Sequence, residues 1–472
     1  MKKFFLCFIL LLFFITFFKL EFVNAYVNNL YLEQAIETAL RNNRSIHQGL
    51  YDRDKAEIDV EMARKAFYPE IDISTSYTRL FIEDEDIFDD YRGIEISLSD
   101  DFLGDIDLDI DIDLDYYLDE IADMIQPSKN NFQTSISIQQ PVYLGGRLRT
   151  GLEQANQGLK ASELQLEQTK NQLVLQVIQL YYNVLLAQER VELEKEFLDL
   201  VNQHKKTAQH SYEHGLTLKT DLLQVEIEQG RAVNSLDDAK NKLLIARRHF
   251  VNITGINLDG RNLEWPELNF NFVKDLESQF RLALENRIEL ELLDINRKVL
   301  ENNLQMEKNS RLPNLILSGN YQWQGEEFSF DDGVGTITLA GNVSLFDKGF
   351  SSSRQKKVEK DIAQLELNRK DLEDYIKIEI EELLLKTRTT SNNISLEKLN
   401  VNRAKENLNI ENRRYQEGMA TNTEVLNAQT LLKQSKLAFL QAEFQYNINI
   451  FTLLDKTGLL LHYWQNNEGW NF

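Results

Sequence analysis

Cysteine, proline and long apolar runs are scarce in this 472-residue chain. Its one cysteine is Cys7, and it contains only five prolines. With a single thiol the chain cannot form an internal disulfide or a metal site built on several cysteines, so packing must supply its stability. Few helix breakers, together with 27% charged residues, favour long helices over a set of small globular domains.

The one long apolar run lies at the N-terminus. Lys2 and Lys3 precede apolar residues from Phe4 to Phe18, and Val23-Asn24-Ala25 follows them. This layout predicts a secretory signal peptide over residues 1–25. No later segment offers roughly 18 apolar residues in succession, so a further membrane-spanning helix is not expected and any membrane crossing would require a β-barrel.

Negative charge is concentrated in one segment. The net charge of −23 argues against nucleic acid as a partner, and residues 83–123 carry much of it. Within this segment an extended ribbon would place six aspartates on one face: Asp105, Asp107, Asp109, Asp111, Asp113 and Asp115. Calcium binding is one interpretation, although the run lacks the glycine and glutamate of an EF-hand loop. The other interpretation is an acidic ribbon on the extracellular side that is solvated or lies at a pore mouth.

The chain contains an internal repeat. Leu32, Ala39, Asn42, Pro69 and Tyr77 recur 244 positions later as Leu276, Ala283, Asn286, Pro313 and Tyr321. Gly146, Tyr212, Gly215, Thr220 and Gly255 recur 203 positions later as Gly349, Tyr415, Gly418, Thr423 and Gly458. The sequence therefore predicts a first repeat over 26–258, which contains the acidic insertion, a second over 259–458, and a short tail over 459–472.

Each repeat combines helical and strand periodicities. Leucines recur every seven residues after Gly146, which predicts a coiled-coil helix, and helix pairs are expected over 146–254 and 349–457. Shorter helical stretches are expected over 32–67 and 276–311, each ending just before a proline. Strict alternation of apolar and polar residues predicts four strands at about 69–81, 131–143, 313–325 and 334–346, each about as long as a tilted membrane strand requires.

Four strands cannot cross a bilayer alone, because the two open sheet edges would leave N–H and C=O groups unsatisfied in hydrocarbon. Several chains must therefore close one barrel. Eight strands enclose only side chains, whereas larger barrels leave a lumen, so at least three copies are expected for a wet pore.

The order helix, strand, strand, long helix, turn, helix, given twice, resembles the TolC-like outer membrane factor family. The Pro141–Arg147 entry to the long helix and the two Tyr-x-x-Gly turns belong to this resemblance. It implies a mainly α fold with a long periplasmic α-barrel and a shared twelve-stranded β-barrel in a homotrimer. It also implies contact with outer-membrane lipid, a periplasmic adaptor protein and an inner-membrane pump. The implied function is the exit duct of an efflux or type I secretion system, without a cofactor.

The same resemblance places the periplasmic aperture and the adaptor contacts at the two turns, at Tyr212, Gly215, Asp221, Tyr415, Gly418 and Glu424. Ala420 and Asn427 stand where a basic and an acidic residue are usual, so part of the expected closing network is missing. Thr421 and Glu424 form a capping-box pattern, which would explain Glu424 by helix capping alone. Because Leu218 replaces the threonine in the first turn, a shared capping role for Asp221 is not expected. If Glu424, with Asp221 behind it, lines a threefold constriction, three like charges would bind cations there and resist closure of the pore unless hydrogen bonds from Tyr415 hold the tips together.

Three other functions fit the sequence less well. His210 and His214 could share one helix face, but no third metal ligand is evident. No set of catalytic residues with a supporting context is present, so an enzyme is not expected. A trimeric adhesin-like surface protein would also use coiled coils, but its strands would gather at one end of the chain.

Overall fold

The computed structural model describes residues 30–79, 81, 130–259, 261–266, 275–328 and 332–465. The expected signal peptide and the acidic segment, including the six aspartates from Asp105 to Asp115, lie outside this part. The chain divides into two compact units. Unit 1 comprises Met1–Asp59, Ala155–Glu301 and Glu359–Phe472, and unit 2 comprises Val60–Gln154 and Asn302–Val358.

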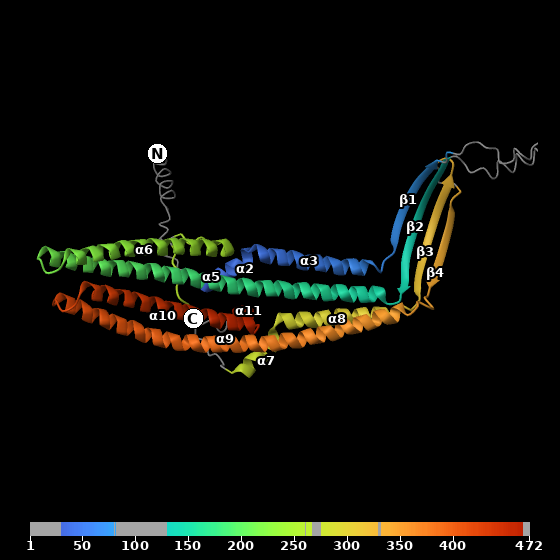
Figure 1. Cartoon of the computed structure of the whole chain (residues 1–472). Coiled ribbons are helices and arrows are strands. Elements are labelled where there is room, and N and C mark those ends of the chain that lie inside the picture. The colour runs from blue at the N-terminus through green and yellow to red at the C-terminus, as the bar shows by residue number, and fades with distance from the viewer. Residues whose placement is uncertain are drawn as a thin grey trace, which may run out of the picture. The chain divides into compact units, whose positions relative to one another are not determined.

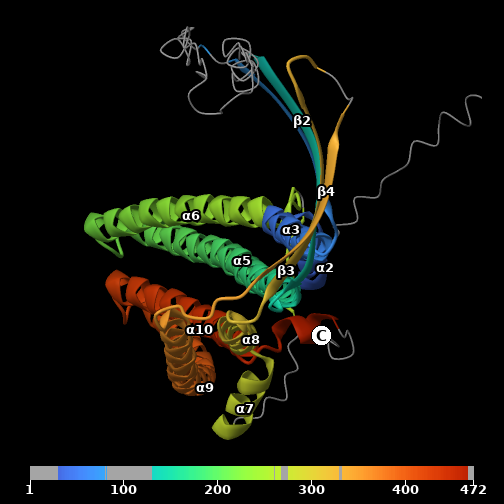
Figure 2. The same cartoon turned by 90° about the vertical axis from the view of Figure 1, so that its right-hand side faces the viewer.

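Unit 2 contains one antiparallel sheet in the order β1-β2-β3-β4, whose curvature is visible in Figure 2. Its strands are β1 (Glu70–Arg79), β2 (Asn130–Leu144), β3 (Asn314–Gly325) and β4 (Val334–Asn342). The two repeats meet at its centre, where β2 pairs with β3. The outer edges of β1 and β4 are therefore free of partners among the described strands.

The register sorts side chains onto two chemically different faces. Ile71 pairs with Ile138, and Ile337 lies opposite Gly319 in the same row, on the apolar face. The neighbouring row holds small polar side chains, and across the polar face the hydroxyls of Ser74 and Ser135 are 2.9 Å apart. The alternation of apolar and polar residues along each strand thus gives the sheet one apolar and one polar face.

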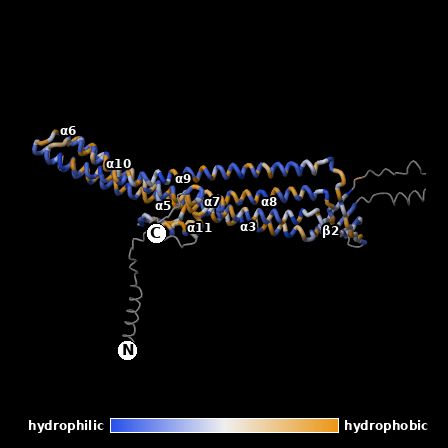
Figure 3. The backbone as a smooth tube through the Cα atoms, turned by 90° about the horizontal axis from the view of Figure 1, so that it is seen from below, coloured by the Kyte–Doolittle hydropathy of each residue, from blue (hydrophilic) through white to orange (hydrophobic). Residues whose placement is uncertain are grey.

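The long helices form two hairpins, labelled in Figure 1. The first consists of α5 (Arg147–Glu213) and α6 (Lys219–Thr254), and the second of α9 (Phe350–Gln416) and α10 (Asn422–Lys456), followed by the short α11 (Leu460–Gln465). Both α5 and α9 have 67 residues. Hydrophobic and hydrophilic positions alternate along these helices (Figure 3), as expected when each helix buries a stripe. Among the described helices, none is long and apolar enough to cross a membrane.

The stretches over 32–67 and 276–311 are helical as expected, but each is interrupted once. Each is two helices, α2 (Leu32–Asn42) with α3 (Arg44–Lys65), and α7 (Leu276–Asn286) with α8 (Ile288–Asn309). The breaks at Asn43 and Arg287 occupy equivalent repeat positions, and both residues have extended backbone angles.

The physical reason for each break is a hydrogen bond to the end of a long helix in the same repeat. Asn43 Nδ2 donates to the carbonyl of Ile253 at 3.0 Å, and Arg287 Nε donates to the carbonyl of Lys456 at 2.6 Å. Helix C-termini leave carbonyls without intrahelical partners, so these side chains satisfy groups that would otherwise be orphaned. Such tertiary bonds leave no periodic signal in the sequence.

The main core of unit 1 is aromatic. Tyr181 and Tyr182 of α5 are buried with Phe250 of α6 and Phe451 of α10. The Tyr181 hydroxyl donates to either of two carbonyls at 2.8 Å, those of Leu30 and Glu264. The Tyr182 hydroxyl is buried and has no hydrogen-bond partner among the described residues.

This difference predicts opposite outcomes for two adjacent substitutions. Tyr181→Phe should destabilise the protein by about 1–3 kcal/mol, because it leaves buried carbonyls without a donor. Tyr182→Phe should be neutral or mildly stabilising, since the hydroxyl it removes is already unsatisfied. Thermal unfolding of both variants, followed by circular dichroism, measures the difference. Equal losses in the two variants would show that the hydroxyl bonds contribute nothing.

Candidate functional site at the two helical turns

The two helical turns have the same backbone geometry. Gly215 and Gly418 have φ angles of 72° and 74°, in the left-handed region. Their N–H groups donate to the carbonyls of Tyr212 at 2.9 Å and Tyr415 at 3.0 Å. In each turn the residue after the glycine donates its N–H to the carbonyl five positions earlier, in the preceding helix. This second hydrogen bond completes a Schellman motif. Glycine is needed here because side chains strain this conformation.

Both carboxylates of the turns cap helices. Glu424 accepts from the Thr421 N–H at 2.6 Å, and the Glu424 N–H donates to Thr421 Oγ1 at 3.3 Å. The bonds that the Glu424 carboxylate accepts from the N–H and the hydroxyl of Thr421 lower the pKa of Glu424. Asp221 accepts from the Leu218 N–H at 3.3 Å.

The expectation that Asp221 has no capping role is therefore wrong. One of the two hydrogen bonds of a capping box joins the carboxylate at the third helical position to the backbone N–H of the N-cap residue. This bond does not involve the side chain of the N-cap residue. Leu218 supplies that N–H as well as a threonine would.

The hydrogen bonds from Tyr415 that would hold the tips of several copies together stay a prediction, since the structure describes a single chain. Among the described residues the Tyr415 hydroxyl is buried without a partner, and its ring packs edge-on against His204 of α5, with centroids 5.0 Å apart. Burial, followed by the nearby charge of Asp221, raises the pKa of Tyr415. Tyr415 thus acts as a packing residue between α9 and α5 in one protomer.

The residues that join the two hairpins at this end are His204 and Asn422. His204 Nε2 lies 2.6 Å from Asn422 Oδ1. Asn422 Nδ2 lies 3.3 Å from both the Asp221 carbonyl and Gln224 Oε1. Asn422 therefore links α10 to α5 and α6 at once. We call His204, Tyr415, Asn422, Asp221 and Gln224 the tip cluster.

Sequence reasoning missed both central residues of the tip cluster. Asn407 and Lys219 stand at the equivalent repeat positions of His204 and Asn422, so neither is a repeat landmark. The sequence signal that could have identified them is that both differ from their repeat counterparts and lie near a turn. Two of the expected site residues, Tyr415 and Asp221, belong to the tip cluster. The others lie at the exposed turns: Tyr212, Gly215, Gly418 and Glu424.

The acid–base state of His204 follows from its surroundings. Burial lowers its pKa, so the imidazole is neutral at pH 7, and Nε2 carries the proton because Asn422 Oδ1 accepts. Because its pKa is depressed on folding, protonation favours the unfolded state, and stability should fall as pH drops below about 6.5.

We expect a larger loss of thermal stability between pH 7.5 and 5.5 in the parent protein than in His204→Gln. Glutamine keeps a donor for Asn422 but cannot titrate. Carboxylates titrate alike in both proteins, so the difference between the two isolates the histidine. An identical pH dependence would exclude His204 as the sensitive group.

His210 and His214 lie close together on α5, with ring centroids 4.3 Å apart. His214 Nδ1 lies 2.8 Å from the His210 carbonyl, so one ring nitrogen is already engaged. Among the described residues no group of three or more His, Cys, Asp or Glu side chains could hold a metal ion.

The fold is similar to that of known outer-membrane proteins. The outer membrane channel CmeC of Campylobacter jejuni is 16% identical, with 91% of this chain and 86% of that chain covered and a TM-score of 0.71. VceC of Vibrio cholerae is 15% identical over 90% and 96%, with a TM-score of 0.68. The open MtrE channel of Neisseria gonorrhoeae is 14% identical over 91% and 89%, with a TM-score of 0.67.

At these identities the structures establish the fold, and the sequence establishes the family. No curated protein sequence matches the chain. The family described as "Outer membrane efflux protein" matches it twice, over residues 35–256 and 280–458, so both repeats carry the family pattern. Nothing in this match supports the adhesin-like alternative. The chain belongs to the outer membrane efflux protein family and is an efflux channel of the outer membrane.

Proposed function

We propose that three copies of this chain close one duct, whose strands span the outer membrane and whose helical turns face the periplasm. The observation that carries the proposal is the exposed apolar face of the four-stranded sheet. Ile73, Ile337 and Leu339 are largely exposed on this face, with relative exposures of 73%, 85% and 65%. Lipid would cover these side chains.

Closure by several copies solves two problems of the isolated sheet. The free edges of β1 and β4 would pair between neighbours, which satisfies backbone groups that lipid cannot satisfy. The row of serine, threonine, asparagine and glutamine side chains would then face the lumen, as in water-filled barrels. Twelve strands from three copies exceed the eight that side chains alone can fill.

We also propose that the two turns dock a periplasmic adaptor, which in turn engages an inner-membrane pump of an efflux or type I secretion system. Exposed apolar side chains support a docking surface at the turns. Leu216 and Leu218 lie in the first turn and Met419 in the second, and all three are exposed. Apolar side chains gathered beside polar ones are typical of protein contact sites.

Two matched substitutions test the assignment of the sheet faces. Ile337→Arg places a charge on the lipid side and should cost about 2–4 kcal/mol if the residue is near the bilayer centre. Thr336→Arg, one residue away on the polar face, should be tolerated. The measurement is the amount of heat-resistant trimer in outer-membrane fractions of cells that express each variant. Equal loss in both variants would contradict the assignment.

The oligomer itself is tested by multi-angle light scattering in mild detergent. We expect the mass of three chains, because two chains give too small a barrel for a lumen. A stable monomeric mass from folded protein would refute the proposed duct.

A further inference from the structure

Two histidines lie on one face of α5 at its C-terminal end. His210 and His214 are four positions apart, and the His214 N–H donates to the His210 carbonyl at 3.2 Å, so the helical hydrogen-bond pattern continues through both residues. Side chains four apart on a helix are neighbours. Both residues are exposed, and their ring centroids are 4.3 Å apart. The two imidazoles therefore lie side by side at the surface.

A hydrogen bond determines which ring nitrogen of His214 carries the proton. His214 Nδ1 lies 2.8 Å from the His210 carbonyl oxygen. That oxygen can only accept, so Nδ1 is the donor and Nε2 of the neutral ring keeps its lone pair. Histidines that bind metals usually donate their other ring N–H to a carbonyl or a carboxylate, which orients the ring. His214 thus has the tautomer and the anchored ring of a metal ligand.

His210 can supply a second nitrogen to the same ion. Neither nitrogen of its ring has a hydrogen-bond partner within the described part of the chain. Two nitrogens that each bind a tetrahedral ion at about 2.1 Å lie roughly 3.3 Å from one another. Rings with centroids 4.3 Å apart reach this separation through small rotations about their side-chain bonds. The pair can therefore chelate one ion.

A negative charge beside the pair favours a bound cation. Glu213 lies directly before His214, and its Oε1 accepts a hydrogen bond from Gln209 Nε2 at 3.0 Å. Glu213 forms no ion pair with the lysines and arginines that the structure describes. Its charge is therefore available to attract a cation to the two imidazoles.

The ending of the helix does not itself require the two histidines. Arg413 and Glu417 occupy the equivalent positions of the second repeat, 203 residues later. The Glu417 N–H donates to the Arg413 carbonyl at 3.1 Å, so the backbone ends in the same way with side chains that cannot chelate a metal. The histidine pair is thus a feature of the first turn alone.

We propose that His210 and His214 bind one divalent transition-metal ion at the end of α5, with water completing its coordination. Imidazole suits Cu²⁺, Ni²⁺ and Zn²⁺, and Cu²⁺ binds nitrogen ligands more tightly than the other two. Mg²⁺ and Ca²⁺ prefer oxygen ligands. Both histidines belong to one chain, so the site requires neither the proposed oligomer nor the proposed duct.

Isothermal titration calorimetry of the detergent-purified full chain, without a polyhistidine tag, tests the site at pH 7.5. Cu²⁺, Ni²⁺ and Zn²⁺ are titrated separately, with excess Mg²⁺ in the buffer to occupy carboxylate sites. We expect one ion per chain and the highest affinity for Cu²⁺. His210→Asn and His214→Asn each leave a single imidazole, so each should lower the affinity at least roughly 100-fold through loss of chelation.

His249→Asn is the matched control. His249 is an exposed histidine of α6, and the residues four positions before and after it are Ile245 and Ile253, so it has no chelating partner on its helix. Its replacement should leave the affinity unchanged. Circular dichroism without metal should show the parent's helix content and thermal unfolding in all three variants, because the replaced side chains are exposed.

Electron paramagnetic resonance of the Cu²⁺-loaded parent protein counts the ligands directly. We expect hyperfine splitting from two imidazole nitrogens. A single nitrogen, or unchanged affinity in His210→Asn and His214→Asn, would overturn the proposal. An equal loss in His249→Asn would also overturn it, because binding would then be spread over surface histidines. A loss confined to the two α5 variants supports the site, whatever mass light scattering gives for the oligomer.

Discussion

Replacing Asn422 with leucine is expected to raise the resting conductance of the channel. Asn422 is buried at the start of α10, and its amide is hydrogen-bonded to α5 and α6. Leucine removes those bonds and leaves the buried His204 N–H without its acceptor. At about 1–3 kcal/mol for such a loss, the population of separated tips should increase roughly 5- to 150-fold.

Thr423→Ala is the matched control for Asn422→Leu, because Thr423 is the neighbouring residue and is exposed. It leaves the capping residue Thr421 and the tip cluster intact. Conductance of the two variants is compared in planar bilayers at the same voltage. If Asn422→Leu conducts like the parent protein, the tip cluster only packs the helices and does not restrain the tips.

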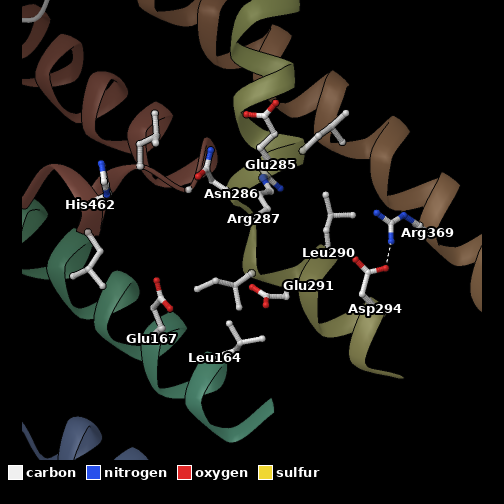
Figure 4. Close-up of a pocket in the computed structure, with 15 residues that line it drawn as sticks. Leu164, Glu167, Glu285, Asn286, Arg287, Leu290, Glu291, Asp294, Arg369 and His462 are labelled. Atoms are coloured by element: carbon white, nitrogen blue, oxygen red, sulfur yellow. Dashed lines mark hydrogen bonds and ion pairs between the residues drawn. The ribbon is translucent and has the colours of Figure 1, made fainter. Parts of the chain in front are cut away.

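Replacing Arg287 with alanine is expected to lower the free energy of unfolding by about 3–5 kcal/mol. The Arg287 side chain is only 6% exposed, bonds the carbonyl of Lys456 and forms an ion pair with Glu379. It also lines a pocket of about 450 Å³ beside Glu285 and Glu291 (Figure 4). Removing the guanidinium would leave a largely buried carboxylate and a helix end without their main donor.

Two variants calibrate the Arg287 prediction. Arg287→Lys keeps the charge but cannot reach both acceptors with a planar fork, so an intermediate loss is expected. Asn43→Ala removes the neutral counterpart in the first repeat and should cost about 1 kcal/mol. Thermal unfolding ranks the three variants. A loss in Arg287→Ala no larger than in Asn43→Ala would mean that Arg287 acts only as a neutral hydrogen-bond donor.

The periodic features of the fold could be read from the sequence. Apolar and polar alternation over residues such as Ile71 to Thr78 predicts a strand with two unlike faces, because side chains of a strand point alternately to its two sides. The constant spacing of 203 positions from Gly146 to Gly255 predicts two equivalent hairpins. Such periodic patterns can be recognised in the sequence because each involves neighbouring residues and recurs many times.

Features that depend on contacts between distant segments could not be read. At the helix breaks, Asn43 and Arg287 donate hydrogen bonds to carbonyls that lie 210 and 169 positions away in the sequence. The contact between His204 and Asn422 spans 218 positions. The capping bond of Asp221 could not be read for a different reason, because its donor is the backbone N–H of Leu218, which every residue except proline carries.

Single-channel recording from purified protein in planar bilayers decides whether three copies of this chain form an open duct. We expect discrete conductance steps from the trimer, small at rest and larger when Asn422→Leu frees the tips. Protein that is trimeric and fully helical, yet gives no steps with either sequence, would contradict a duct formed by three copies of this chain.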